Sequence, residues 1–301
     1  MLYVLKPDKI TKEDVKLVGG KGANLGELVQ AEFPVPECFF ISVDAYYKFL
    51  EFNDLQYHIS NIISKIDFSD INSLKKGSNE IVDLILNSRM PPQIKDEIAT
   101  AYKDMMYAKF PSIEFIKAGR ELPFVAIRSS AITEDIQKAS SAGQYESFLN
   151  VRGYENVIYN VIKCWASLFT ARAMYYRKKY GQPLETGIGV IVQRMVNADR
   201  SGVAFTVDPA NPVEGKNNII MEGCFGLGET LVQGQVEPDY YIVDKETGKI
   251  IEKRIGKKII QRVRDYASGT TVQQPVPPDK ISAQVLADSE ITALAAYLAS
   301  L

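Results

Sequence analysis

The chain has 301 residues, of which 46% are hydrophobic and 24% are charged, as is typical of a globular protein with a sizeable core. Its 35 basic and 37 acidic residues give a formal net charge of −2, so no basic excess favours a nucleic-acid partner. No signal sequence and no apolar run of bilayer length is apparent, so we expect a cytoplasmic protein without a membrane partner.

The first third of the chain is expected to form two short strands and several helices. Strands are predicted at Leu2–Leu5 and Cys38–Ile41. Between them, the strand-like run 15–18 leads into a glycine-rich loop, Gly19–Gly22, and then into a helix. Residues 42–109 follow a mostly helical pattern, with acidic and basic residues alternating on the exposed faces.

Strand signals dominate the later part of the chain. A buried strand at 123–127 ends at Arg128, and one long helix is predicted over residues 155–180. The further strand-like runs, the last interpreted as a hairpin, are Ile188–Val196, Gly202–Val207, Asn218–Glu222 and Tyr240–Lys257. A proline-rich link precedes a final helix that begins near Asp288. Because no glycine, proline or basic turn closes this helix, we expect the chain to be part of a longer polypeptide.

Histidine and cysteine usage argues against several kinds of catalytic site. The only histidine, His58, lies in an amphipathic helical stretch, where a structural or solvated side chain is the expected role. A zinc site or a histidine-dependent triad is therefore poorly supported. The three cysteines are far apart in the sequence and are expected to be buried free thiols: Cys38, Cys164 and Cys224.

Three glycine-rich segments could bind phosphate. In the first, glycines allow backbone N–H groups close to phosphate oxygens, and Lys21 adds a positive charge at a helix N-terminus. A plain tight turn with a solvated lysine is the open alternative. In the second, Arg128 offers a planar fork for phosphate, although a pair with Glu134 or Asp135 is also possible. The third, Glu222–Glu229, lacks the βαβ unit of a dinucleotide fold.

Taken together, these segments resemble the N-terminal ATP-binding region of the pyruvate phosphate dikinase and phosphoenolpyruvate synthase family. The segments that carry the resemblance are Leu17–Gly26, Ala126–Ala131 with Glu134 and Asp135, Ser141–Gln144 with Phe148–Val151, Trp165–Phe169, Gln193–Val196, Ser201–Pro209 and Gly226–Glu229. They span nearly the whole chain. The resemblance implies an α+β, ATP-grasp-like fold with two lobes, residues 1–186 carrying the phosphate loops and residues 187–301 forming a strand-rich lobe.

The resemblance also implies roles for individual residues. Lys21 and Arg128 would be the catalytic residues that hold the ATP phosphates, and the loop 140–143 would close over them. The strand 193–196 would present backbone groups to adenine. Asp208 and Glu222 are weaker candidates for ribose or metal-water contacts, and Asp208 could equally cap the turn that follows it. The nucleotide-binding residues implied are Gly20, Gly22, Ser140, Ser141, Gly143, Gln193, Met195, Val196, Asp208 and Glu222.

The resemblance further implies ATP and Mg²⁺ as ligands and a swivelling phosphohistidine domain as partner. That domain and the pyruvate-binding domain are absent from this sequence, and the family's metal-binding Glu and Gln are expected beyond Leu301. We therefore expect a phosphotransferase fragment that binds nucleotide weakly and does not turn over completely. The segment 232–240 favours a phosphoenolpyruvate synthase. A rifampicin phosphotransferase, a phosphate-using dikinase and a non-catalytic ATP-sensing protein are the alternatives.

Overall fold

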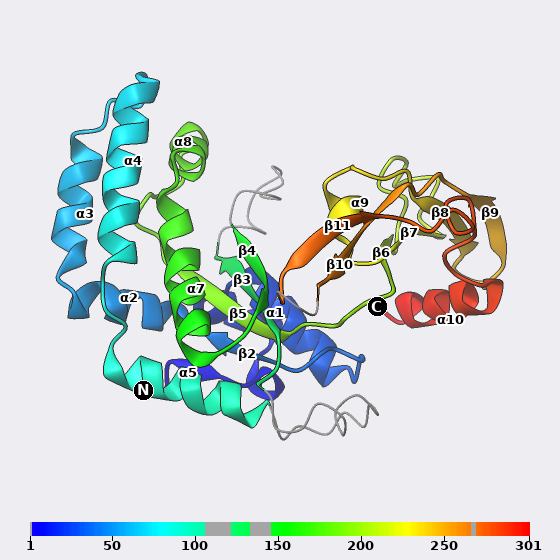
Figure 1. Ribbon diagram of the computed structural model, residues 1–301, viewed down its shortest axis with the longest axis horizontal. Helices are drawn as coiled ribbons and strands as arrows, with labels where there is room; N and C mark the ends of the chain where they lie inside the picture. Colours follow the sequence, from blue (N-terminus) through cyan, green and yellow to red (C-terminus); the bar gives the residue numbers. More distant parts are fainter. Residues whose placement is uncertain (1, 106–121, 133–145, 266–268) are drawn as a thin grey trace. The chain divides into compact units, whose positions relative to one another are not determined.

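The computed structural model describes residues 2–105, 122–132, 146–265 and 269–301 (Figure 1). The chain forms two compact units, Met1–Met195 and Val196–Leu301, and mixes helices with antiparallel sheets. The division falls later than the expected boundary after residue 186, because strand β5, Ile188–Arg194, pairs with strands of the first unit. The α+β class is confirmed.

The first unit contains one sheet and most of the helices. Its described strands form a five-stranded sheet in the order β1-β2-β5-β3-β4. The strands are β1 (Val4–Leu5), β2 (Cys38–Ile41), β3 (Val125–Ala131), β4 (Ser147–Val151) and β5 (Ile188–Arg194). The helices are η1 (Pro7–Lys9), η2 (Lys12–Asp14), α1 (Val15–Gln30), α2 (Val43–Phe52), α3 (Leu55–Ser64), α4 (Ile71–Leu86), α5 (Pro92–Asp104), α7 (Tyr154–Ala166), η3 (Ser167–Phe169) and α8 (Ala171–Lys179).

The two faces of this sheet are covered differently. Alternate side chains of β3 and β5, including Ile127 and Val190, pack with α2, α4, α5 and α7 in the larger core around Trp165. The intervening side chain Ile191 faces the other way, into a smaller cluster with Phe40 and Val18 under α1. Helix α1 therefore lies against the second face of the sheet, where it contacts β3 and β5.

Two expectations for the first unit need correction. The predicted helix over residues 155–180 is broken into α7, η3 and α8, because Thr170 leaves the helical conformation (ψ 146°) and caps α8 by accepting the Ala173 N–H. The predicted strand-like run 15–18 is helical and belongs to α1. Two side-chain expectations hold: His58 is exposed on α3, and the three cysteines are buried and free.

The second unit is built from two antiparallel sheets. Its described strands form a four-stranded sheet in the order β6-β7-β8-β9 and a hairpin of β10 and β11, which the sequence analysis missed. The elements are β6 (Arg200–Phe205), β7 (Asn218–Phe225), α9 (Glu229–Val232), β8 (Asp239–Asp244), β9 (Ile250–Arg254), β10 (Ile260–Arg264), β11 (Thr271–Pro275) and α10 (Asp288–Ala299). The predicted hairpin of β8 and β9 is confirmed, with Gly248 in its turn at φ 67°.

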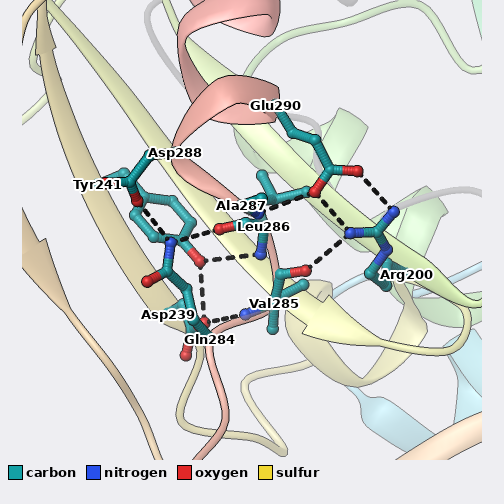
Figure 2. Close-up of polar contacts among 9 residues, drawn as sticks. All are labelled: Arg200, Asp239, Tyr241, Gln284, Val285, Leu286, Ala287, Asp288 and Glu290. Atoms are coloured by element: carbon teal, nitrogen blue, oxygen red, sulfur yellow. Dashed lines mark hydrogen bonds and ion pairs between the residues drawn. The ribbon is translucent and has the colours of Figure 1, made fainter.

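A polar network fastens α10 and the segment before it to the sheet of the second unit (Figure 2). Asp239 is fully buried on β8 and pairs with Lys258, which is also fully buried. Its carboxylate accepts three further bonds, from Gly256 N–H at 3.1 Å, Val285 N–H at 2.6 Å and the Tyr241 hydroxyl at 2.9 Å. This buried acid therefore has partners on both of its oxygens.

The second part of the network lies at the start of α10. Arg200 donates two bonds to Glu290, at 2.7 and 2.8 Å, and a third to the carbonyl of Val285 at 3.0 Å. Glu290 also accepts the N–H of Ala287 at 2.8 Å and so caps the helix (Figure 2). The hydrogen bonds from Arg200, with that from Ala287, lower the pKa of Glu290 from its ordinary 4.5 to about 2.

This pKa shift predicts a pH-dependent contribution of Glu290 to stability. Because the folded pKa is depressed, the stabilisation is fully present above pH 4.5 and is lost as the pH falls from 4.5 toward 2. We expect Glu290→Gln to unfold at lower urea than the parent at pH 7, and the two midpoints to approach each other as the pH falls from 4.5 toward 2. Urea titrations of both proteins across this range test the prediction. A midpoint difference that stays constant with pH would contradict it.

Candidate functional site

The glycine-rich segment of the first unit is a break within α1, not a loop after a strand. Gly19 has φ 75° and ψ 168°, so the helix stops there and restarts at Gly20. A Cβ atom on Gly19 would lie 2.0 Å from the carbonyl oxygen of Ser130 on β3. Only glycine combines this positive φ with such a close approach to another backbone. The sequence thus places a helix restart directly against the sheet.

Lys21 lies in the first turn of the restarted helix. The next residue, Gly22, donates its N–H to the Ser130 hydroxyl at 2.9 Å, and a Cβ on Gly22 would lie 2.9 Å from that of Val18. Gly20 and Gly22 are buried, whereas Lys21 is half-buried. Gly22 therefore serves close packing and its N–H is already engaged, so Lys21 is the residue of this segment best placed to meet a ligand.

Arg128 lies on the same face of the sheet as Ser130, because side chains two residues apart in a strand point the same way. It is half-buried, and its Nη1 donates to the Gln193 side-chain oxygen of β5 at 3.2 Å. Gln193 in turn donates to the carbonyl of Pro36 at 3.4 Å. Arg128 therefore lies on the sheet face that is covered by α1, the helix that carries Lys21. The alternative partners of Arg128, at 134 and 135, lie outside the described residues.

Cys38 is the neighbour of this pair on β2, opposite Gln193 in the register. Burial raises the pKa of the Cys38 thiol to about 12, although the positive charge of Arg128 opposes the increase. The thiol therefore stays protonated at neutral pH and is not suited to be a nucleophile. It contributes a small neutral side chain near Arg128.

The strand expected to contact adenine ends at the boundary between the units. The N–H of Arg194 pairs with the carbonyl of Glu37 at 2.8 Å, and that of Met195 pairs with the carbonyl of Phe124 at 2.9 Å. Val196 begins the second unit and is 56% exposed. The N–H groups of residues 194 and 195 therefore bond within the first unit.

Asp208 and Glu222 belong to the second unit. Asp208 accepts the N–H of Ala210 at 2.8 Å, the turn-capping contact considered as its alternative role. Glu222 lies within β7, opposite Tyr240 of β8, in the strand predicted from Asn218 onward. Burial raises the pKa of Tyr240, and the charges of Asp208 and Glu222 raise it further. Both carboxylates therefore lie close enough to Tyr240 to raise the pKa of its phenol.

The remaining expected residues, Ser140, Ser141 and Gly143, lie outside the described residues. Within the described ranges, no group of three or more His, Cys, Asp or Glu side chains could hold a metal ion. Among the described helices, none is long and apolar enough to cross a membrane. Sequence reasoning assigned no role to the Ser130 hydroxyl, although its period-two spacing from Arg128 was a signal for a shared face.

The family assignment rests on the match over most of the chain. Residues 15–301 match the family described as pyruvate phosphate dikinase, AMP/ATP-binding domain. The chain belongs to this family of nucleotide-binding domains, as the resemblance of its glycine-rich segments indicated.

Three similar proteins are each named phosphoenolpyruvate synthase or probable phosphoenolpyruvate synthase. The chain is 42% identical to the probable phosphoenolpyruvate synthase of Methanothermobacter thermautotrophicus, over 97% of this chain and 41% of the relative. It is 39% identical to the probable phosphoenolpyruvate synthase of Methanocaldococcus jannaschii, over 98% and 24%. It is 38% identical to the phosphoenolpyruvate synthase of Pyrococcus furiosus, over 96% and 39%. The chain thus spans between about a quarter and two fifths of the length of these relatives.

Proposed function

We propose that this chain is the ATP-binding, phosphoryl-donating part of a phosphoenolpyruvate synthase. The observation that supports the proposal is that α1, which carries Lys21, packs on the sheet face of Arg128, where Ser130 accepts the N–H of the residue after Lys21. A half-buried ammonium at a helix restart and a half-buried guanidinium on a strand are suited to an anion with several oxygens. The names of the similar proteins favour the synthase over the antibiotic phosphotransferase, the dikinase and the sensing protein.

In this proposal the phosphate groups of ATP bind Lys21 and Arg128. The two side chains come from different elements, so they can contact different phosphate oxygens and limit the rotation of the triphosphate. Gln193 keeps the guanidinium of Arg128 in one orientation through its 3.2 Å contact. The strand 193–196 contacts adenine. The fold is ATP-grasp-like, with the two compact units as its lobes.

Magnesium is the second ligand of the proposal. This ion is commonly held by one or two carboxylates together with substrate phosphates and water, so it does not need a cluster of protein ligands. Asp208 and Glu222, whose charges both raise the pKa of Tyr240, are suited to contact metal-bound water. When bound, the ion would offset the negative charge of the phosphate oxygens. Its main carboxylate ligands are proposed to lie in the remainder of the longer protein.

The complete reaction would convert ATP, pyruvate and water to AMP, phosphoenolpyruvate and phosphate. A histidine on another part of the longer protein would accept the phosphoryl group, which divides the transfer into easier steps. His58 is exposed on α3, away from the glycine segments in sequence, and is not proposed for this role. We expect this chain alone to bind the nucleotide without completing the reaction.

Calorimetric titration with magnesium-ATP tests the proposal. Each charge-assisted phosphate contact contributes about 1.5–3 kcal/mol, so losing one should weaken binding at least about tenfold. We expect saturable binding by the parent and a loss of at least about a hundredfold in the double variant Lys21→Ala, Arg128→Ala.

The matched control is Lys16→Ala, Arg172→Ala. It removes the same two types of charge from exposed positions of α1 and α8 and should bind ATP like the parent. Equal weakening by the two double variants would indicate a general charge effect and would contradict the assigned site. A parent chain that does not bind ATP would contradict the nucleotide-binding role of this chain.

A further inference from the structure

Strand β3 contains two consecutive buried serines whose side chains point to opposite faces of the sheet. Ser129 and Ser130 follow one another on β3, and both are at most 1% exposed. The Ser129 hydroxyl donates to the carbonyl of Glu146 at 3.1 Å, whereas the Ser130 hydroxyl accepts the N–H of Gly22 at 2.9 Å. Because neighbouring residues of a strand alternate between faces, only Ser130 shares a face with Arg128.

The Ser130 contact acts on the residue next to Lys21. In a helix, the backbone N–H of the third residue after a break has no partner in the preceding turn and needs an acceptor from elsewhere. Ser130 supplies that acceptor from the sheet. The same serine fits closely against Gly19, where a Cβ would lie 2.5 Å from its hydroxyl oxygen. Ser130 therefore contacts both sides of the helix break, Gly19 and Gly22.

The position of Lys21 relative to Arg128 follows from this contact. Arg128 and Ser130 are two positions apart on an interior strand of the sheet, about 7 Å along the strand. Lys21 and Gly22 are consecutive residues of a helix whose start is tied to Ser130. The backbone at Lys21 and the backbone at Arg128 are therefore both fixed relative to the same strand.

We propose that Ser130 is a positioning residue for ATP binding, which acts by holding the glycine break of α1 so that Lys21 and Arg128 address the same phosphate groups. The inference rests on the proposed function, because it explains how the two assigned phosphate contacts are kept in register. Ser130 itself does not need to touch the nucleotide. Its hydroxyl replaces the backbone acceptor that an unbroken helix would have provided.

A double-mutant cycle in the complete 301-residue chain tests this role, with magnesium-ATP as the probe. We expect Ser130→Ala to weaken ATP binding about tenfold in the parent background, the amount expected for one misplaced phosphate contact. In the Lys21→Ala background the same change should have less than a twofold effect, because the residue on which Ser130 acts is gone. Ser129→Ala, a buried serine of the same strand that faces the other way, should leave ATP binding unchanged in both backgrounds.

Ser130→Cys protects the test against a folding defect. Its thiol occupies the same place but is a weaker hydrogen-bond acceptor, so binding should fall between that of the parent and that of Ser130→Ala. Thermal unfolding followed by Trp165 fluorescence shows whether each variant is folded at the titration temperature. A Ser130→Ala effect that persists undiminished without Lys21 would overturn the positioning role. ATP binding by Ser130→Ala equal to that of the parent would overturn it as well, without affecting the proposed function. A parent chain that does not bind ATP would overturn both.

Discussion

Replacing Asp239 by asparagine is expected to destabilise the second unit by about 3–5 kcal/mol, the usual cost of leaving one member of a buried ion pair without its partner. Lys258 would remain fully buried with its charge uncompensated. The substitution also replaces one acceptor oxygen by an NH₂ donor, although each oxygen of Asp239 accepts hydrogen bonds from two donors. Whichever way an asparagine amide is turned, its NH₂ group faces donors and cannot accept from them.

Urea unfolding followed by circular dichroism, with hydrogen exchange of the amides in β8 and α10, measures this loss. Glu252→Gln is the control, since it removes one member of the Arg254–Glu252 pair, whose side chains are 66% and 44% exposed. An exposed pair contributes little, so the control should change stability by less than about 0.5 kcal/mol. A similar small change for Asp239→Asn would show that the buried network does not hold α10 to the sheet.

Gly19→Ala is expected to destabilise the first unit by about 4 kcal/mol or more. A side chain at φ 75° and ψ 168°, a region that is essentially confined to glycine, costs about 1–3 kcal/mol. At this position the added Cβ would also lie 2.0 Å from the carbonyl oxygen and 2.4 Å from the carbonyl carbon of Ser130, which are backbone atoms of a buried strand. These atoms can move away only if α1 separates from β3 or the sheet distorts.

The control for this prediction is Gly181→Ala. Gly181 has a similar φ of 66°, but a Cβ built there has no atom within 4 Å. Gly181→Ala should therefore lose only the stability that the strained backbone conformation costs, about 1–2 kcal/mol. Trp165 is the only tryptophan and is fully buried in the first unit, so its fluorescence in urea reports on both variants. Equal losses for the two variants would mean that the contact with Ser130 can relax.

Elements with a strong local pattern could be predicted from the sequence. The apolar run Cys38–Ile41 is β2, and the helical pattern over 42–109 corresponds to α2 through α5 within the described residues. The β8–β9 hairpin was recognisable from its glycine-containing turn. These features depend on neighbouring residues, which is why periodicity and turn chemistry were enough to find them.

Features that depend on distant residues could not be predicted. The run 15–18 looked like a strand because it is apolar, but its side chains pack under the sheet as part of α1. The β10–β11 hairpin follows Lys258, whose burial is possible only because Asp239 lies beside it. Likewise, Ser130 gains its role from Gly22, which is more than a hundred residues away in the sequence. Such pairings have no local signature.

The order of the strands in the first unit also determines when its sheet can be completed during synthesis. β5 lies between β2 and β3, yet it is the last strand of this sheet to leave the ribosome. Until residue 194 has emerged, the edges of β2 and β3 that it will join are unpaired and can associate with other chains. The Gln193 side chain that contacts Arg128 arrives with the same strand. Nascent chains shorter than this would therefore lack both a complete sheet and the Gln193 contact that orients Arg128, which makes the interval before β5 the period of greatest need for chaperones.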